Sequence, residues 1–200
     1  MAPVRVPVEA LQEFVDFDAF YQWLAQNHDK AEEVWVRLFR KGSGRRSIDA
    51  AQAIDAVLCW GWIDAIRKSH DTESFVQRYC PRRPKSVWSQ VNRDNVARLE
   101  AAGLMTENGR RQVELARQDG RWDAAYRTKD AAPDDLIAAI AASARAQACY
   151  EQLSAQNRFA LNFRVNALKT EAGRKKRIAA FVEMLERGET IYPQRPIVTP

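Results

Sequence analysis

The N-terminal third of the chain changes from a helical to a strand-like pattern of hydrophobic residues. Aromatic and apolar side chains recur at helical spacing up to Asn27, and Asp16 or Asp18 can cap this helix. Residues 34–39, VWVRLF, then alternate between two sets of side chains and lead into the turn 42–44, GSG. This pattern predicts a helix followed by a strand. The GSG stretch has no following Lys-Thr pair, so we interpret it as a turn and not as a phosphate loop.

A second helix is expected between Ser47 and Trp60. Ser47 can serve as its N-cap, and Asp49 then lies in the first turn, where the helix dipole favours an acid. Gly61 stands where a helix needs a left-handed residue, which only glycine adopts cheaply. Cys59 and Trp60 are therefore assigned to the last helical turn. The apolar stripe of this helix is Ile48, Ala51, Ile54, Val57 and Leu58.

The next two segments predict a β-hairpin. Residues 62–69, WIDAIRKS, and 73–80, ESFVQRYC, are rich in β-formers and are joined by the polar turn HDT. Simple alternation places Trp62, Asp64 and Ile66 on one face of the first strand.

After the turn PRRP at 81–84, the pattern is helical to the end of the chain. We expect a helix closed by Gly103, a helix from Thr106 to Gly120, and three later helices opened by Pro133, Ser154 and Thr170. The tail 192–200 is proline-rich and is expected to be extended. The apolar face of the first of these helices is Trp88, Val91, Val96, Leu99 and Ala102.

The order of these elements predicts the α+β class, with a small antiparallel sheet followed by a helical C-terminal unit. The polar stretch 126–133 suggests a boundary, so we divide the chain into an α+β domain at 1–128 and a helical segment at 129–200.

Composition favours a globular protein in a reducing compartment. Hydrophobic residues make up 46% and charged residues 28% of the 200 positions, as in soluble domains. The three cysteines are odd in number and widely spaced, which indicates buried thiols and not a disulfide framework. The N-terminus shows no export signal, and no apolar stretch approaches the length of a membrane span. We therefore expect a cytoplasmic protein without a transmembrane segment; the sequence leaves its oligomeric state open.

Positive charge gathers in two stretches, although the formal net charge is only +5. Residues 78–98 hold six basic side chains against one acid, and residues 164–187 hold seven against three, including the block RKKR at 174–177. Such stretches are typical of solvated helix faces, and also of surfaces that bind nucleic acid, acidic proteins or anionic membranes.

Catalytic and metal-site templates are not found. The two histidines, His28 and His70, each stand beside an aspartate in a polar turn, and the chain has no G-x-S-x-G, H-E-x-x-H or C-x-x-C motif. We therefore predict no catalytic residues, no metal and no cofactor, and the sequence leans away from an enzyme. An enzyme acting on a small phosphorylated or sugar substrate would need a second titratable group near Asp64.

One group of residues suggests a ligand cleft. The paired arginines of PRRP lie on a stiff backbone next to a helix start, which can attract anions, and tryptophans can flank them. Asp64 either contributes a carboxylate to this cleft or pairs with Arg82 or Arg83 to fix the hairpin. Core packing is the alternative for each tryptophan. The candidate ligand-binding residues are Trp60, Trp62, Asp64, Arg82, Arg83, Lys85, Ser86, Trp88 and Asn92.

Four segments carry a resemblance to a known family. They are AVLCWGWIDAIRK, YCPRRPKSVWSQVNRDNVARLEAAGLMTENG, GRWDAAY and ALKTEAGRKKRI, and together they extend from about Phe17 to Arg187. The chain resembles the YdeI/OmpD-associated family, also called bacteriocin-protection proteins. It departs from the family pattern at Trp60, where phenylalanine is usual, and at Gly173, where threonine is usual, so no role of that threonine is carried over.

The resemblance implies a bacterial protein with a YjbR/CyaY-like α+β part and a helical bacteriocin-protection segment, and it implies no established catalytic activity. We therefore expect a non-enzymatic binding protein linked to envelope-stress or antimicrobial-peptide protection, whose cleft takes a small anionic or polar ligand. The alternative is a nucleic-acid-associated protein that uses the basic stretches 78–98 and 164–187.

Overall fold

The computed structural model describes residues 5–127 and 132–197. Contacts within the chain divide it into two compact units, Met1–Ala125 and Tyr126–Pro200. The boundary that the sequence suggests between residues 128 and 129 lies outside the described residues. Each unit has its own hydrophobic core.

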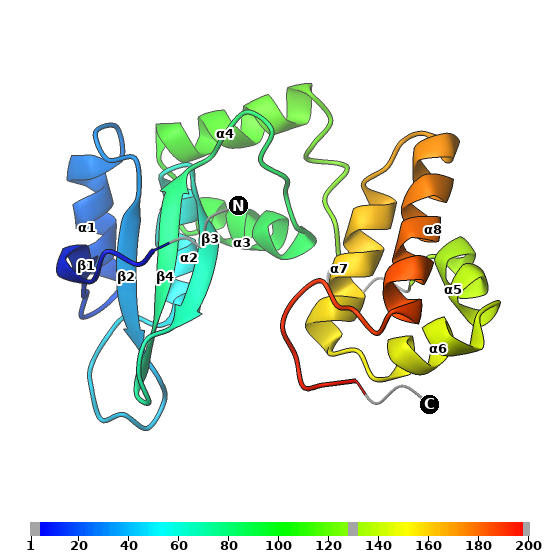
Figure 1. Ribbon diagram of the computed structural model, residues 1–200. Coiled ribbons are helices and arrows are strands. Elements are labelled where there is room, and N and C mark those ends of the chain that lie inside the picture. Colours follow the sequence, from blue (N-terminus) through cyan, green and yellow to red (C-terminus); the bar gives the residue numbers. More distant parts are fainter. Residues whose placement is uncertain (1–4, 128–131, 198–200) are drawn as a thin grey trace. The chain divides into compact units, whose positions relative to one another are not determined.

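The first unit is built on a four-stranded sheet (Figure 1). Its strands are β1 (Leu11–Gln12), β2 (Val34–Phe39), β3 (Trp62–Ser69) and β4 (Ser74–Pro81), in the order β1-β2-β4-β3. The hairpin and its antiparallel pairing with β2 confirm the prediction, but β1 runs parallel to β2, so the sheet is mixed. Two residues are too few to show a strand period, which is why the sequence gives no sign of β1.

Helices cover one face of this sheet. They include α1 (Phe17–Asn27) and α2 (Ala50–Cys59), which pack with Val34, Val36 and Leu38 of β2 in one hydrophobic core. The helices α3 (Gln90–Ala101) and α4 (Glu107–Gln118) follow, and a short 3-10 turn, η1 (Val8–Ala10), precedes β1. The α+β class predicted from the order of elements is therefore confirmed.

Side-chain caps fix where the helices begin. Asp16 accepts a hydrogen bond from the backbone N–H of Ala19 and opens α1. The cap of α2 is Asp49, because its side chain and that of Gln52 exchange hydrogen bonds with each other's backbone N–H groups. The prediction of Ser47 was wrong by two residues, since the Ser47 hydroxyl instead accepts from the backbone N–H of Phe39.

A bulge in β3 overturns the expected sharing of one face by Trp62, Asp64 and Ile66. Asp64 lies opposite Tyr79, but the next paired residue, Arg67, lies opposite Gln77. Between these two pairs β3 advances by three residues while β4 advances by two. Arg67 therefore lies on the same face as Asp64, where simple alternation would place Ile66.

Two members of the predicted apolar face of α3, Val91 and Ala102, are exposed. Val91 on α3 is 54% exposed, and Trp88, which is buried, precedes this helix because Ser89 is its N-cap. Among the thiols, Cys59 and Cys149 are buried as expected, whereas Cys80 is only partly buried.

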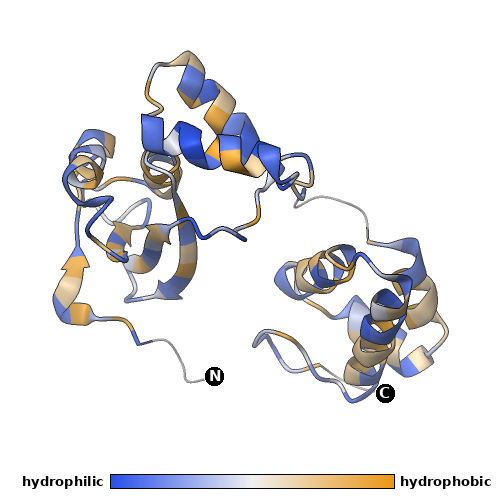
Figure 2. Ribbon diagram, turned by 90° about the horizontal axis from the view of Figure 1, so that it is seen from above, coloured by the Kyte–Doolittle hydropathy of each residue, from blue (hydrophilic) through white to orange (hydrophobic). Residues whose placement is uncertain are grey.

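The described residues of the second unit form four helices. They are α5 (Asp134–Ala141), α6 (Ala144–Glu151), α7 (Ala155–Asn166) and α8 (Glu171–Glu186). Ser154 and Thr170 cap α7 and α8 as predicted, while Pro133 is the N-cap of α5 and not its first helical residue. Orange and blue alternate along the helices of both units in Figure 2, as expected where one stripe faces a core. No helix in the described ranges has the length and apolarity needed to cross a bilayer.

Candidate functional site

The segment CWGWID at 59–64 is the point where α4 meets the end of α2. Gly61 has φ +74°, the left-handed conformation predicted for it. A Cβ at Gly61 would lie 2.8 Å from Cγ of Gln112 and 2.9 Å from the carbonyl oxygen of Asn108. Gly109 packs in the same way, because a Cβ there would overlap the carbonyl group of Cys59. The two glycines therefore allow α4 to approach the chain turn directly.

Hydrogen bonds of Thr106 stabilise this contact between α4 and the end of α2. Its hydroxyl and its backbone N–H both donate to the carbonyl oxygen of Cys59, at 2.5 and 3.1 Å. The same hydroxyl accepts from the backbone N–H of Gly109 and so caps α4. One side chain therefore joins the beginning of α4 to the end of α2.

A hollow of about 280 Å³ opens beside this contact, and we refer to it as the Trp60 hollow. Its walls come from the end of α1, the α2–β3 turn, the end of β4 and one face of α4. The lining residues are His28, Asp29, Trp60, Gly61, Trp62, Pro81, Arg82, Asn108, Arg111, Gln112 and Leu115.

Aromatic rings and polar groups lie together where the ends of α1 and α2 meet α4. The ring of His28 lies 4.6 Å from that of Trp60, and its Nε2 lies 2.8 Å from Nδ2 of Asn108. The indole N–H of Trp62 donates to the carbonyl oxygen of His28 at 3.2 Å. The indole nitrogen of Trp60 is buried and has no hydrogen-bond acceptor in the described part of the chain.

Positive charge reaches the hollow from two elements. Arg82 is 7% exposed; its guanidinium lies 3.5 Å from the ring centre of Trp88, and Nη1 donates to the carbonyl oxygen of Val87. Arg111 on α4 is exposed. With the amide side chains of Asn108 and Gln112, the arrangement offers cations, amide groups and an aromatic surface, which suits a small anionic or polar ligand.

Three of the predicted site residues line this hollow, namely Trp60, Trp62 and Arg82. Trp88 lies beneath Arg82, and the hydroxyl of Ser86 accepts from the backbone N–H of Arg83. The side chains of Arg83 and Lys85 are exposed, and Asn92 lies in the first turn of α3.

Asp64 lies on the sheet, opposite Tyr79, and does not line the Trp60 hollow. The pairing expected between Asp64 and Arg82 or Arg83 stays a prediction; the backbone N–H of Arg83 donates to the hydroxyl of Ser86. Burial, and secondarily the charge of Asp64, raises the pKa of the Tyr79 phenol. Asp64 therefore acts electrostatically on a buried neighbour.

The residues of α4 that line the hollow were not among the site residues predicted from the sequence. Asn108, Arg111, Gln112 and Leu115 have the spacing of one helix face, which is a recognisable pattern. The pattern does not say which surface the face meets, because α4 follows Gly61 by more than 40 residues.

Many side chains of the two predicted basic stretches have partners within the protein. Arg78 pairs with Glu33 at 3.1 Å and Arg98 with Asp55 at 2.6 Å. In the block RKKR, Arg174 pairs with Asp135 at 2.6 Å and Lys175 with Glu171 at 2.7 Å. These pairs reduce the charge that both stretches offer to a polyanion. Over the described residues, no group of three or more potential metal ligands is present.

Comparison with known proteins assigns the two parts of the chain separately. Residues 12–112 match the family model described as domain of unknown function DUF8412. Residues 131–188 match the model described as bacteriocin-protection, YdeI or OmpD-associated, which confirms the resemblance for the C-terminal segment. The curated proteins and the solved structures give no match. The chain therefore belongs to the DUF8412 family through half of its length, and its C-terminal segment is a YdeI/OmpD-associated domain.

Proposed function

We propose that this is a binding protein whose Trp60 hollow takes a small anionic or polar ligand, and that it acts in protection against antimicrobial peptides or envelope stress. The observation that carries the proposal is that Trp60, Gly61 and Trp62 line one hollow together with Pro81 and Arg82. Two sequence motifs that are 20 residues apart thus contribute to the same surface.

The chemistry of the wall supports the class of ligand. Arg82 and Arg111 supply positive charge, and the side chains of Asn108 and Gln112 supply amide groups. A carboxylate or phosphate group could accept from such donors, while an apolar part of the ligand contacts the indole ring. The physiological role is supported by the family description of the C-terminal segment, which refers to bacteriocin protection.

The experiment is a challenge assay with a matched pair of variants. A bacterial strain that produces the protein is exposed to a bacteriocin and compared with strains that produce Arg111→Gln or Arg117→Gln. Both arginines are exposed on α4, but only Arg111 lines the hollow. We expect protection by the unchanged protein and by Arg117→Gln, and loss of protection with Arg111→Gln. Equal sensitivity of all strains, including one without the protein, would refute the proposal.

A further inference from the structure

The far end of the sheet from the Trp60 hollow carries a second polar surface. The loop between β2 and α2 begins after Phe39 and holds Arg40, Lys41, Arg45 and Arg46 around two glycines. All four basic side chains are exposed. Gly42 and Gly44 have φ +94° and +72°, so the loop turns sharply and presents its basic residues within a short span.

This loop lies beside the turn between β3 and β4 (Figure 1). The backbone N–H of Arg40 donates to the carbonyl oxygen of Glu73 at 2.8 Å. The end of β3 adds Arg67 to the same end of the sheet, where it donates to the side chain of Gln77. We refer to residues 37–46, together with Arg67 and Phe75, as the basic end. Residues 37–46 hold five basic side chains and no acid, and the fold adds Arg67 from a second segment.

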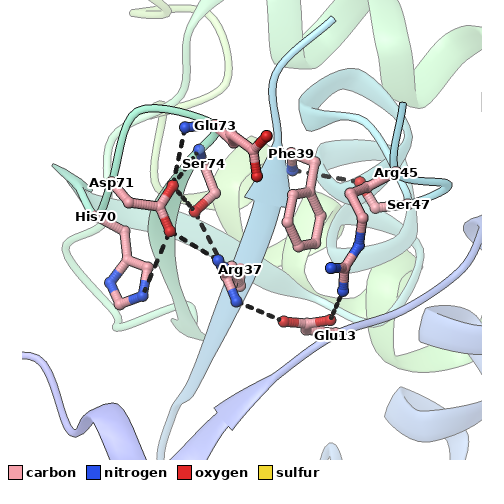
Figure 3. A network of polar contacts seen from close by, with 9 residues as sticks. All are labelled: Glu13, Arg37, Phe39, Arg45, Ser47, His70, Asp71, Glu73 and Ser74. Carbon is pink, nitrogen blue, oxygen red and sulfur yellow. Dashed lines mark hydrogen bonds and ion pairs between the residues drawn. The ribbon is translucent and has the colours of Figure 1, made fainter. Parts of the chain in front are cut away.

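Carboxylates near the basic end bind some of its arginines: Figure 3 shows Asp71 and Glu13, and Asp16 binds Arg46 at 3.2 Å. Asp71 binds Arg37 at 2.7 Å and also accepts from the side chain and backbone of Ser74. Glu13 binds Arg37 at 3.1 Å and meets Arg45 at 3.8 Å. In the part of the chain that the structure covers, no carboxylate lies within ion-pair distance of Arg40 or Lys41. An excess of exposed positive charge therefore remains on the loop.

Arginines also cover the two aromatic rings at this end. The guanidinium carbons of Arg37 and Arg45 both lie 4.7 Å from the ring centre of Phe39. Those of Arg40 and Arg67 lie 5.9 and 4.6 Å from the ring centre of Phe75. Rings that alternate with exposed guanidinium groups are the platform on which unpaired nucleobases stack, while cations beside them hold the phosphates.

We infer that the basic end binds single-stranded nucleic acid. A duplex fits less well, because its bases are already stacked and offer no free face to the Arg45–Phe39 stack. An anionic membrane fits less well too, because residues 40–46 contain no apolar side chain that could enter the lipid interface. The surface is separate from both predicted basic stretches and from the Trp60 hollow, so the inference does not rest on the proposed function.

The test uses the full chain and a labelled 12-nucleotide single strand, with fluorescence anisotropy at several salt concentrations. The loop variant carries Arg40→Gln, Lys41→Gln, Arg45→Gln and Arg46→Gln. A control variant removes the same charge from four exposed residues of the second unit, Arg145, Lys169, Lys176 and Arg177. Circular dichroism and thermal melting establish that both variants fold.

We expect the unchanged protein to bind with an affinity that falls as salt rises. The loop variant should bind at least tenfold more weakly, and its salt slope should fall by about 3, since each phosphate contact on a single strand contributes about 0.7. Phe39→Leu should weaken binding about fivefold or more without changing that slope, because stacking is lost and charge is kept.

Four results would overturn the inference. They are absence of binding at low salt, an equal loss of affinity in the control variant, tighter binding of a duplex of the same length, and equal or tighter binding of anionic lipid vesicles. The second result would mean that total charge and not the loop attracts the strand.

Discussion

The guanidinium of Arg82 lies on the indole of Trp88, 3.5 Å from the ring centre, while the adjacent Arg83 is exposed. Two arginines between the same pair of prolines thus have opposite environments. Arg82 connects the end of β4 to the segment before α3, because it also donates to the carbonyl oxygen of Val87 and its backbone N–H donates to Gly61.

Replacement of Arg82 by alanine should lower the free energy of unfolding by about 2 to 4 kcal/mol. The variant loses a desolvated cation–π contact and a charged hydrogen bond. Arg83→Ala is the matched control and should change stability by less than about 0.5 kcal/mol, as surface substitutions do. Urea denaturation measures both. Equal effects of the two substitutions would show that the stacking on Trp88 contributes nothing.

Gly109→Ala should destabilise the first unit by about 1 to 3 kcal/mol. The added Cβ would overlap the carbonyl group of Cys59, so α4 has to move away. The sign of this change in stability is informative, because alanine in an unhindered helix interior is about 1 kcal/mol more favourable than glycine. Thermal melting distinguishes the two cases, with Gln118→Ala on the exposed end of α4 as control. A stabilised Gly109→Ala protein would mean that α4 does not contact the α2–β3 turn.

Asp71 should make stability depend on acid pH. Its hydrogen bond from the Ser74 hydroxyl, followed by backbone N–H groups and Arg37, lowers the pKa of this carboxyl to about 2. Since the folded pKa lies below the unfolded value near 4, the contribution is present above about pH 5 and disappears as pH falls towards 2. The melting temperatures of the unchanged protein and Asp71→Asn should therefore differ at pH 7 and converge near pH 2. A difference that stays constant over this range would contradict the assignment, and Asp123→Asn serves as the exposed control.

Asn157→Ala should release the segment that follows α8. The side chain of Asn157 is 1% exposed, donates to the carbonyl oxygen of Tyr192 and to Gln194, and accepts from the backbone N–H of Tyr192. Its removal leaves these groups without partners and should cost about 2 to 3 kcal/mol. Hydrogen exchange of the Tyr192 amide should become faster, whereas Gln156→Ala at the exposed neighbouring position should leave it unchanged. Unaltered exchange in Asn157→Ala would mean that other contacts hold the segment.

Most of the correct fold predictions rest on rules that involve residues close together in the sequence. Thr106, Ser154 and Thr170 cap the helices expected of them, and Asp16, one of two candidates, caps α1, because a cap depends on residues three positions away. Gly61 was assigned correctly for the same reason. The bulge after Asp64 was not predicted. An extra residue leaves the composition of a strand unchanged, so a bulge is recognised only from the pairing with the neighbouring strand.

For the candidate site too, the sequence did not reveal residues that come together only through tertiary packing. Trp60 and Arg82 were associated because their motifs are distinctive, whereas His28 and Arg111 entered only through the packing of α1 and α4. The basic run at residues 37–46 was not weighed as a binding surface, because the segment was interpreted only as a strand that ends in a turn.

The central claim is that the Trp60 hollow binds a small anion, and an NMR titration tests it most directly. Labelled protein is titrated with inorganic phosphate and with citrate, and the indole N–H of Trp60 and the side chain of Arg111 are followed. We expect saturable shifts at both positions with at least one of these anions, and their loss in Arg111→Gln but not in Arg117→Gln. No shift of the Trp60 indole with either anion, or an unchanged titration in Arg111→Gln, would contradict the account.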